Sequence, residues 1–185
     1  AALGIALHIS PSGLRWAKDG STGYKTKFKG IICTPSNTGI GAASTAAFTG
    51  DLDGSDNWDY ICSQDPDGTE DAVVAENYPA FNWVNTYNKI YTAQLGGAKP
   101  AWYMPSLAEL CEVYKNKNVI NTSLAKIWNI NNNYADASLG TNYFWSSSQF
   151  SDADIGAWLV NVFNGDVNWF YSKPHSSRVC CLAGF

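Results

Sequence analysis

The most suggestive nucleophiles in this chain are a pair of adjacent cysteines and a run of three serines. Cys180 and Cys181 are neighbours in a stretch that is predicted to be a strand, and neighbouring residues of a strand point to opposite faces. A reactive thiolate needs a base or a cation beside it, and only Arg178 is close in sequence. The run 146–148 lacks the glycines that flank the serine of a nucleophile elbow. The sequence therefore predicts no catalytic residue and a protein that is not an enzyme.

A cluster of aspartates is the second feature with possible chemistry. Asp51, Asp53, Asp56 and Asp59 are spaced somewhat like calcium ligands, but Gly54 is out of register with the glycine that an EF-hand loop requires. The chain has only two histidines and no CxxC pair, which argues against zinc. We therefore expect these aspartates to form a turn and a helix cap, and we expect neither a metal ion nor another cofactor.

The stretch NWFYSKPH, residues 168–175, points to binding rather than catalysis. A strand sends successive side chains to opposite faces, so Trp169, Phe170 and Tyr171 cannot all enter one core. At least one large ring must face outward. Exposed aromatic rings are frequent anchors of protein interfaces, so this stretch is a candidate for contact with a partner.

The composition is that of one folded domain. The chain has 185 residues, 45% of them hydrophobic and 15% charged, which is enough for a sizeable core. Its formal net charge is −4 and no basic cluster occurs, so nucleic acid is not an expected partner. No apolar run approaches the roughly 18 residues of a membrane helix. The odd number of cysteines, 5, argues against a complete disulfide framework, and most are expected to be buried thiols.

Several elements can be expected from local patterns. Alternation in LGIALHI predicts a half-buried strand over residues 3–9, and LRWAKDG is expected to return beside it as a hairpin. Two main helices are expected to begin near Pro79 and at Ser106, where Ser106 and Glu109 form a capping box. The stretch INTSLAKIWNI predicts a further short helix.

The last part of the chain is expected to form strands. The predicted strands are YFWSSSQ, AWLVNVF, NWFY and RVCCL, and the dipeptide Asn164-Gly165 predicts a hairpin between the second and third. Strands, then helices, then an antiparallel block indicate an α+β fold rather than a repeated βαβ unit.

Four motifs in the second half of the chain together resemble one bacterial family. They are WYMPSLAEL, YFWSSSQ, AWLVNVFNGDVN and the terminal RVCCLAGF, and the match is dense from about Trp102 to Phe185. They resemble the variable proteins of diversity-generating retroelements, such as those displayed on treponemes. That family has a C-type-lectin-like fold, which is also related to the formylglycine-generating enzyme fold. The resemblance implies one C-type-lectin-like α+β domain over residues 1–185, with antiparallel strands and two main helices. It also implies that the N-terminal and C-terminal strands lie together.

The resemblance also implies a function. A member of this family would be a receptor or adhesion protein on the bacterial outer membrane, held by a lipid anchor on an N-terminus that precedes Ala1. Its segment 150–176 would be diversified to vary binding specificity, and its partner would be an unknown protein or another cell-surface ligand. The alternative is an invariant carbohydrate-binding or structural surface domain of the same fold. The calcium-binding triplets of C-type lectins are absent, since SQDPDG carries an extra aspartate at Asp65 and no WND occurs.

The family often has asparagine at its diversified positions, and this chain departs from that pattern. Mutation of the adenines of an AAC codon reaches Phe, Asp, Ile, Tyr, Pro, His and Ser, but not Trp, Lys, Glu, Gln or Met. Two further positions are added because strand alternation places them outward. The predicted ligand-binding residues are Phe150, Asp152, Asp154, Ile155, Leu159, Phe163, Asp166, Asn168, Phe170, Tyr171, Pro174, His175 and Ser176.

Strand alternation also predicts a scaffold beneath these residues. In AWLVNVF, Leu159 and Phe163 share the face opposite to Trp158, and a face that mixes Leu, Asn and Phe suits presentation better than packing. Beyond the turn, Asn168 and Phe170 are expected to face outward. The residues expected to pack inward are Trp145, Trp158, Val160, Val162, Val167 and Trp169.

Overall fold

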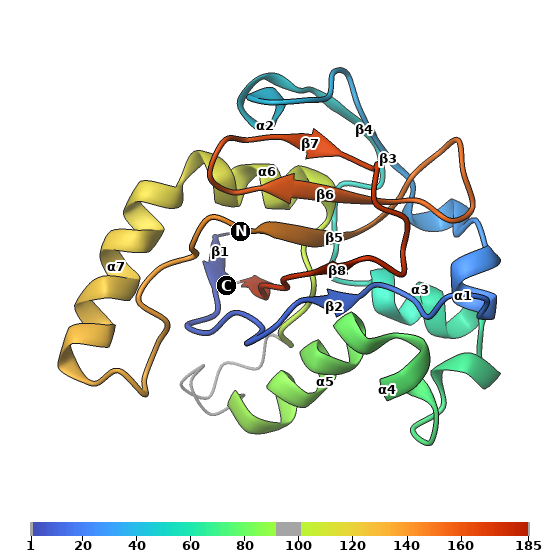
Figure 1. Ribbon diagram of the computed structural model, residues 1–185, viewed down its shortest axis with the longest axis horizontal. Helices are drawn as coiled ribbons and strands as arrows, with labels where there is room; N and C mark the ends of the chain where they lie inside the picture. Colours follow the sequence, from blue (N-terminus) through green and yellow to red (C-terminus); the bar gives the residue numbers. More distant parts are fainter. Residues whose placement is uncertain (1, 92–100, 185) are drawn as a thin grey trace.

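The computed structural model describes residues 2–91 and 101–184 as a mixed α/β fold with small antiparallel sheets (Figure 1). The helices are α1 Thr22–Lys25, η1 Lys29–Ile31, α2 Ala42–Thr45, α3 Asn57–Gln64, η2 Asp67–Thr69, α4 Val74–Asn77, α5 Pro79–Tyr91, α6 Leu107–Lys115 and α7 Lys117–Ile130. The strands are β1 Leu3–Ile5, β2 Leu14–Arg15, β3 Cys33–Pro35, β4 Phe48–Gly50, β5 Tyr143–Gln149, β6 Ala157–Asn161, β7 Val167–Asn168, β8 Ser176–Ser177 and β9 Leu182–Gly184. None of the described helices is long and apolar enough to cross a membrane.

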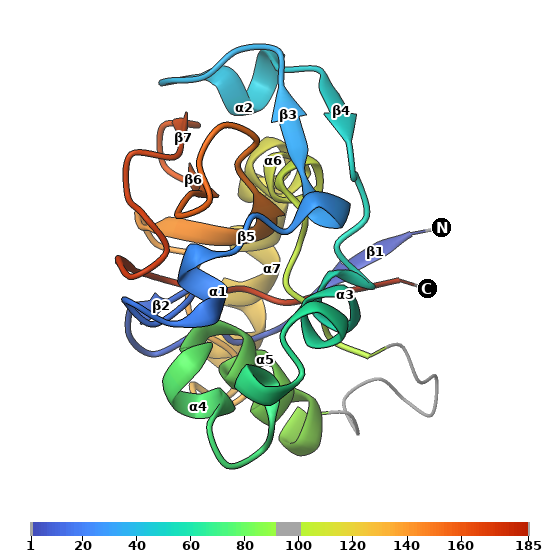
Figure 2. The ribbon, with the colours of Figure 1, turned by 90° about the vertical axis from the view of Figure 1, so that its right-hand side faces the viewer.

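The first and last strands lie together, as expected. β1 pairs antiparallel with β9, and the two ends of the described chain lie side by side in both views (Figures 1 and 2). The predicted return of residues 14–20 onto the first strand is wrong, because Leu14 pairs with Ser177 of β8. The Trp16 amide then donates to the Lys173 carbonyl at 2.9 Å. The N-terminal segment therefore satisfies its backbone groups on the C-terminal segment, a pairing that no local turn signal reveals.

The largest sheet has the order β5-β6-β7 and contains the predicted hairpin. Val160 of β6 pairs with Phe144 of β5 and with Val167 of β7. The turn between β6 and β7 contains Gly165, whose φ of +70° favours glycine. A Cβ there would come within 2.7 Å of the Tyr114 ring, so the turn also needs glycine for space. The hairpin predicted from Asn164-Gly165 is confirmed.

This sheet is buried on both faces, which corrects one part of the alternation argument. Trp158 and Val160 pack with Leu107 and Leu110 of α6 in one core cluster, as predicted for the scaffold face. The opposite face is also covered, because Leu159 belongs to the second core cluster, which contains Trp16. Leu159 is fully buried, so its prediction as a presented residue is wrong. Alternation shows that two faces exist, but it does not show that one of them meets solvent.

Among the described helices, three rather than the two expected have nine or more residues. α5 begins at Pro79 and α6 begins after Ser106, as predicted. The Ser106 Oγ accepts from the Glu109 amide at 3.2 Å, and the Glu109 carboxylate accepts from the Ser106 amide at 2.9 Å. The helix that was expected to be short has 14 residues, begins at Lys117 and is the longest in the described part of the chain. The chain turns at Asn116, where α6 ends, and a new helix starts at once.

Candidate ligand-binding surface

The thirteen predicted ligand-binding residues divide by exposure. Those that are exposed are Asp152, Asp154, Ile155, Phe163, Phe170, Tyr171, His175 and Ser176. Asp166 and Pro174 are half-buried. Phe150, Leu159 and Asn168 are buried, which contradicts their prediction as presented residues. Most of the predicted set therefore does reach the surface, but three of its members belong to the scaffold.

Exposed aromatic side chains lie on both sides of β7 along the chain. Phe163 is 65% exposed at the turn before β7, beside Lys117, whose Nζ donates to the Phe163 carbonyl at 2.6 Å. Phe170 is 77% exposed and Tyr171 is 42% exposed, both just after β7. We refer to Trp169, Phe170 and Tyr171 as the exposed aromatic segment. The sequence required at least one of these three adjacent rings to face outward, and in the structure all three reach solvent.

Trp169 was predicted to pack inward, and this prediction is wrong. β7 ends at Asn168, so the alternation of the strand does not continue into the next residue. Trp169 is 38% exposed and stacks on Phe150, with centroids 4.3 Å apart and planes 10° apart. Phe150 in turn meets buried Trp158 edge-on at 5.1 Å. The Phe150 ring therefore takes the inward place expected of Trp169, and a continuous row of rings runs from the core to the surface.

Buried Asn168 takes part in a small hydrogen-bond network. Its Nδ2 donates to the Asp166 carboxylate at 2.8 Å, and the Tyr143 hydroxyl donates to the same Asp166 oxygen at 2.6 Å. Burial and this hydrogen bond raise the pKa of Tyr143, so its hydroxyl stays protonated and donates. The network fixes the chain just before the exposed aromatic segment.

The loop between β5 and β6 is fixed by Gln149, a residue that the sequence reasoning did not single out. Gln149 is fully buried, and its Nε2 lies 2.9 Å from the carbonyl oxygens of both Ala153 and Gly156. The loop thereby presents Asp152, Asp154 and Ile155 to solvent. The Ile155 carbonyl accepts from the Lys173 amide at 2.9 Å, so the loop and the segment after β7 lie side by side.

Lys173 holds the segment after β7 in place, and it is the second such residue that the sequence did not reveal. Its side chain is fully buried, and its Nζ donates to the carbonyls of Gly23 at 2.9 Å and Thr26 at 2.8 Å. The ammonium group lies 4.7 Å from the centroid of the Trp16 ring and 5.0 Å from that of Phe28. Burial lowers the pKa of Lys173 to about 7. Lysine is rarely buried without an ion-pair partner, and composition alone gives no sign of it.

A polar cavity adjoins the exposed aromatic segment. It has a volume of about 380 Å³ and lies between Tyr143, His175, Ser176 and Arg178. Tyr171 stacks on His175 with centroids 3.9 Å apart and meets Tyr143 edge-on at 6.1 Å. The rings of Tyr143 and His175 therefore form a wall between the cavity and the exposed aromatic segment. Burial lowers the pKa of His175, which favours the neutral imidazole.

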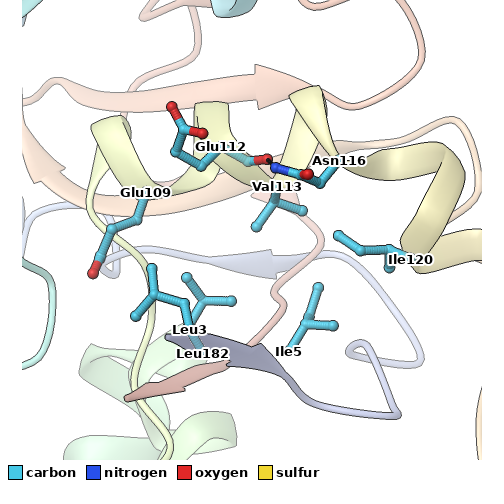
Figure 3. A pocket seen from close by; sticks show the side chains of 8 residues that line it. All are labelled: Leu3, Ile5, Glu109, Glu112, Val113, Asn116, Ile120 and Leu182. Carbon is cyan, nitrogen blue, oxygen red and sulfur yellow. Dashed lines mark hydrogen bonds between the residues drawn. The ribbon is translucent and has the colours of Figure 1, made fainter. Parts of the chain in front are cut away.

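Another cavity, of about 250 Å³, lies away from these residues. Leu3, Ile5 and Leu182 of the terminal strands face Val113 and Ile120 of the helices across it, with polar side chains at its rim (Figure 3). It contains none of the predicted ligand-binding residues.

The residues that suggested chemistry occupy structural positions. Cys180 and Cys181 belong to different core clusters, so they do face opposite ways. Burial raises the pKa of Cys180 to about 12, so its thiol stays protonated at neutral pH. The Asp51 and Asp53 carboxylates accept from backbone amides two residues on, as in turns. Within residues 2–91 and 101–184, no group of three or more His, Cys, Asp or Glu side chains could hold a metal ion.

Comparison with known proteins gives a fold and no family. No family model matches the chain, and no curated protein matches it. The structure is similar to the crystal structure of a fimbrial protein from Bacteroides ovatus ATCC 8483, with a TM-score of 0.61 and 13% sequence identity. The similarity covers 100% of this chain and 36% of that protein, so this chain spans little more than a third of its length. At this identity the likeness concerns the fold alone.

Proposed function

We propose that this chain is a surface-displayed, non-enzymatic binding protein that contacts its partner through the exposed aromatic segment and the neighbouring exposed residues of 150–176. The observation that carries the proposal is the high exposure of Phe163 and Phe170 on a hairpin whose scaffold residues, Trp158 and Val160, are buried. Exposing such rings to water costs free energy unless a partner covers them. Interface anchors of this kind typically contribute about 2 kcal/mol or more each.

The way in which the surface is held supports this function. Buried Gln149 fixes one loop from below and buried Lys173 fixes the adjoining segment. Both side chains hydrogen-bond to backbone carbonyls, so they do not depend on which side chains the loops present. A surface of this construction loses little conformational entropy on binding and tolerates substitution at its exposed positions.

We further propose that the fold is the C-type-lectin-like one and that the exposed positions are diversified by a retroelement. The four sequence motifs support both points, and the exposure of eight of the thirteen candidate positions supports the second. On this proposal the protein stands on a bacterial outer membrane through a lipid anchor. Its ligand is a protein or another cell-surface molecule and not a nucleic acid. The fold shared with a fimbrial protein is compatible with that location.

The alternative function is an invariant carbohydrate-binding or structural surface domain. One observation favours it, a cavity of about 310 Å³ lined by Trp83, Tyr87, Tyr91, His8 and Asp136. Aromatic rings beside polar groups suit the apolar face and the hydroxyls of a sugar. This cavity lies on α5, whereas the proposed diversified residues lie on the C-terminal segment.

Sequencing the gene in independent clones tests diversification. We expect substitutions to fall within 150–176, at the exposed positions, while Trp158 and Lys173 stay constant, and a template repeat with a reverse transcriptase to lie near the gene. An unchanging gene without such neighbours would favour the alternative.

Binding itself can be tested with a displayed library of random peptides. We expect the wild-type protein to enrich binding peptides and the Phe170→Ala variant to lose them. A change at exposed Asp67 of η2, outside the proposed surface, serves as the matched control. Failure to enrich any peptide, or enrichment that Phe170→Ala leaves unchanged, would contradict a binding role for this segment.

A further inference from the structure

The polar cavity beside the exposed aromatic segment has the composition of an anion site. Its volume of about 380 Å³ is within the range of small-ligand sites. Ser176 and Asn142 contribute a hydroxyl and an amide to its lining. The cavity shares the rings of Tyr143 and His175 with the exposed aromatic segment, so one ligand could reach both.

Arg178 supplies the positive charge of this cavity. Its Nη1 donates to the Ser10 carbonyl at 2.7 Å, which fixes the guanidinium at one corner. Among the described residues, no carboxylate oxygen lies within 4.0 Å of a guanidinium nitrogen of Arg178, and the ion pairs that do form involve other side chains. A guanidinium has five N–H donors, so most of them face no protein anion. Burial lowers the pKa of His175, which favours its neutral form and leaves Arg178 as the permanent cation of the site.

The Asp166 carboxylate also contacts Tyr143, but its side-chain hydrogen bonds go to groups other than Arg178. It accepts hydrogen bonds from the Tyr143 hydroxyl at 2.6 Å and from Asn168 Nδ2 at 2.8 Å. It forms no ion pair with Arg178 within 4.0 Å. The guanidinium therefore keeps the capacity to pair with an external anion, and its planar geometry suits a carboxylate bound through both oxygens.

We propose that this cavity binds a carboxylate group of a protein partner, whose neighbouring apolar side chain covers Phe170 and Tyr171. The inference rests on the proposed binding function and names the chemistry that the surface selects. A protein partner is favoured over an acidic sugar because Phe170 is 77% exposed and Trp169 lies beside it, so the ligand must cover a broad apolar area. An acidic side chain and a chain terminus both supply this carboxylate chemistry.

Two small probes test the proposal on the wild-type protein. N-acetylphenylalaninate carries a ring and a carboxylate, and N-acetylphenylalaninamide carries the same ring without the charge. Backbone amide shifts of residues 175–178, followed by nuclear magnetic resonance, should show the carboxylate probe binding at least about fivefold more tightly than the amide probe. Its dissociation constant should be about 10 mM or lower. Glucuronate, which lacks the apolar ring, should bind more weakly than N-acetylphenylalaninate.

Two variants separate the cavity from the exposed aromatic segment. Arg178→Gln should abolish the preference for the carboxylate probe, and Arg178→Lys should retain part of it. Phe170→Ala should weaken both probes by a similar factor. The wild-type comparison needs no variant, so it stands even if Arg178→Gln fails to fold after losing its bond to Ser10.

The possible results distinguish this inference from the binding function itself. Equal binding of the two probes, or no shift at residues 175–178 with either of them, would overturn the carboxylate site. The peptide-library result at Phe170 would still decide the broader function. Tighter binding of glucuronate than of N-acetylphenylalaninate would overturn the choice of a protein partner.

Discussion

Replacing Lys173 with methionine should change how the free energy of unfolding depends on pH. Lys173 is fully buried, and burial lowers its pKa from the usual 10.5 to about 7. In the unfolded chain the side chain returns to water and to its usual pKa. Between these two values the unfolded state therefore binds one more proton than the folded state. The free energy of unfolding then rises with pH by up to about 1.4 kcal/mol per pH unit.

The size of the effect follows from these two pKa values. Only part of the slope is present at pH 7, where the folded group is half protonated, and nearly all of it is present by pH 8. We expect Lys173 to add about 2 kcal/mol of stability between pH 7 and pH 9. This contribution is complete only above the usual pKa and is lost as pH falls toward 7. The sign is the opposite of that for a lysine held by a carboxylate.

Other groups also titrate between pH 7 and pH 9, and their contribution to the free energy of unfolding must be separated from that of Lys173. The cysteines have raised pKa values in the folded protein, for example about 11 for Cys33 and about 12 for Cys111. They release protons from the unfolded chain first and so lower stability as pH rises above about 8. Lys173→Met leaves these thiols in place. The difference between wild type and variant therefore isolates Lys173.

The assay is urea unfolding of both proteins at pH 7, 8 and 9, at constant ionic strength and with a reductant present. Lys173→Met leaves the carbonyls of Gly23 and Thr26 without their donor, so its overall stability changes too. The readout is the pH dependence of the difference and not its size at one pH. A difference that stays constant from pH 7 to pH 9 would refute the reasoning. It would mean that the two carbonyls and the two aromatic rings keep Lys173 charged despite its burial.

Other substitutions test the scaffold by urea unfolding at pH 7. Trp158→Ala should lose about 3 to 5 kcal/mol, whereas Trp169→Ala should lose less because its ring is 38% exposed; equal losses would contradict the assignment of Trp169 to the surface. Phe163→Ala should change stability by no more than about 0.5 kcal/mol, and a larger loss would show that the ring packs. Ser106→Ala should cost about 1 kcal/mol through the lost cap, and an unchanged midpoint would argue against it. Gly165→Ala should destabilise the hairpin, because its φ is +70° and a Cβ would meet Tyr114; wild-type stability would refute this.

Local features of the fold were accessible from the sequence because their causes are local. The capping box at Ser106, the helix start at Pro79 and the turn at Gly165 each depend on residues within a few positions of one another. The buried face of β6 followed from alternation, since Trp158 and Val160 are two residues apart and must share a side. The pairing of the first and last strands was expected from the resemblance and not from a local pattern.

The sequence predicted correctly that some residues of the candidate site are exposed. It failed where the exposure of a side chain depends on a residue from another segment that packs against it. Phe163 and Phe170 were predicted to face outward from strand alternation, and both are exposed, although each lies just beyond the end of its strand. Phe150 lies beyond the end of β5, and only its contact with Trp169 decides that it is covered. Alternation along a strand could not predict that Phe150 is buried and Trp169 is exposed, because the two rings belong to different segments of the chain.

The sequence by itself determined the capping box at Ser106, the hairpin turn at Gly165 and the presence of more rings near the C-terminus than one core face can hold. Only the tertiary structure decided which of those rings reach solvent. It covered Leu159 with a second core, and it buried Lys173 beneath the N-terminal segment, 147 residues from the carbonyl of Thr26. The physical reason is that burial and pKa depend on what packs against a side chain, and here the packing partners come from distant parts of the chain.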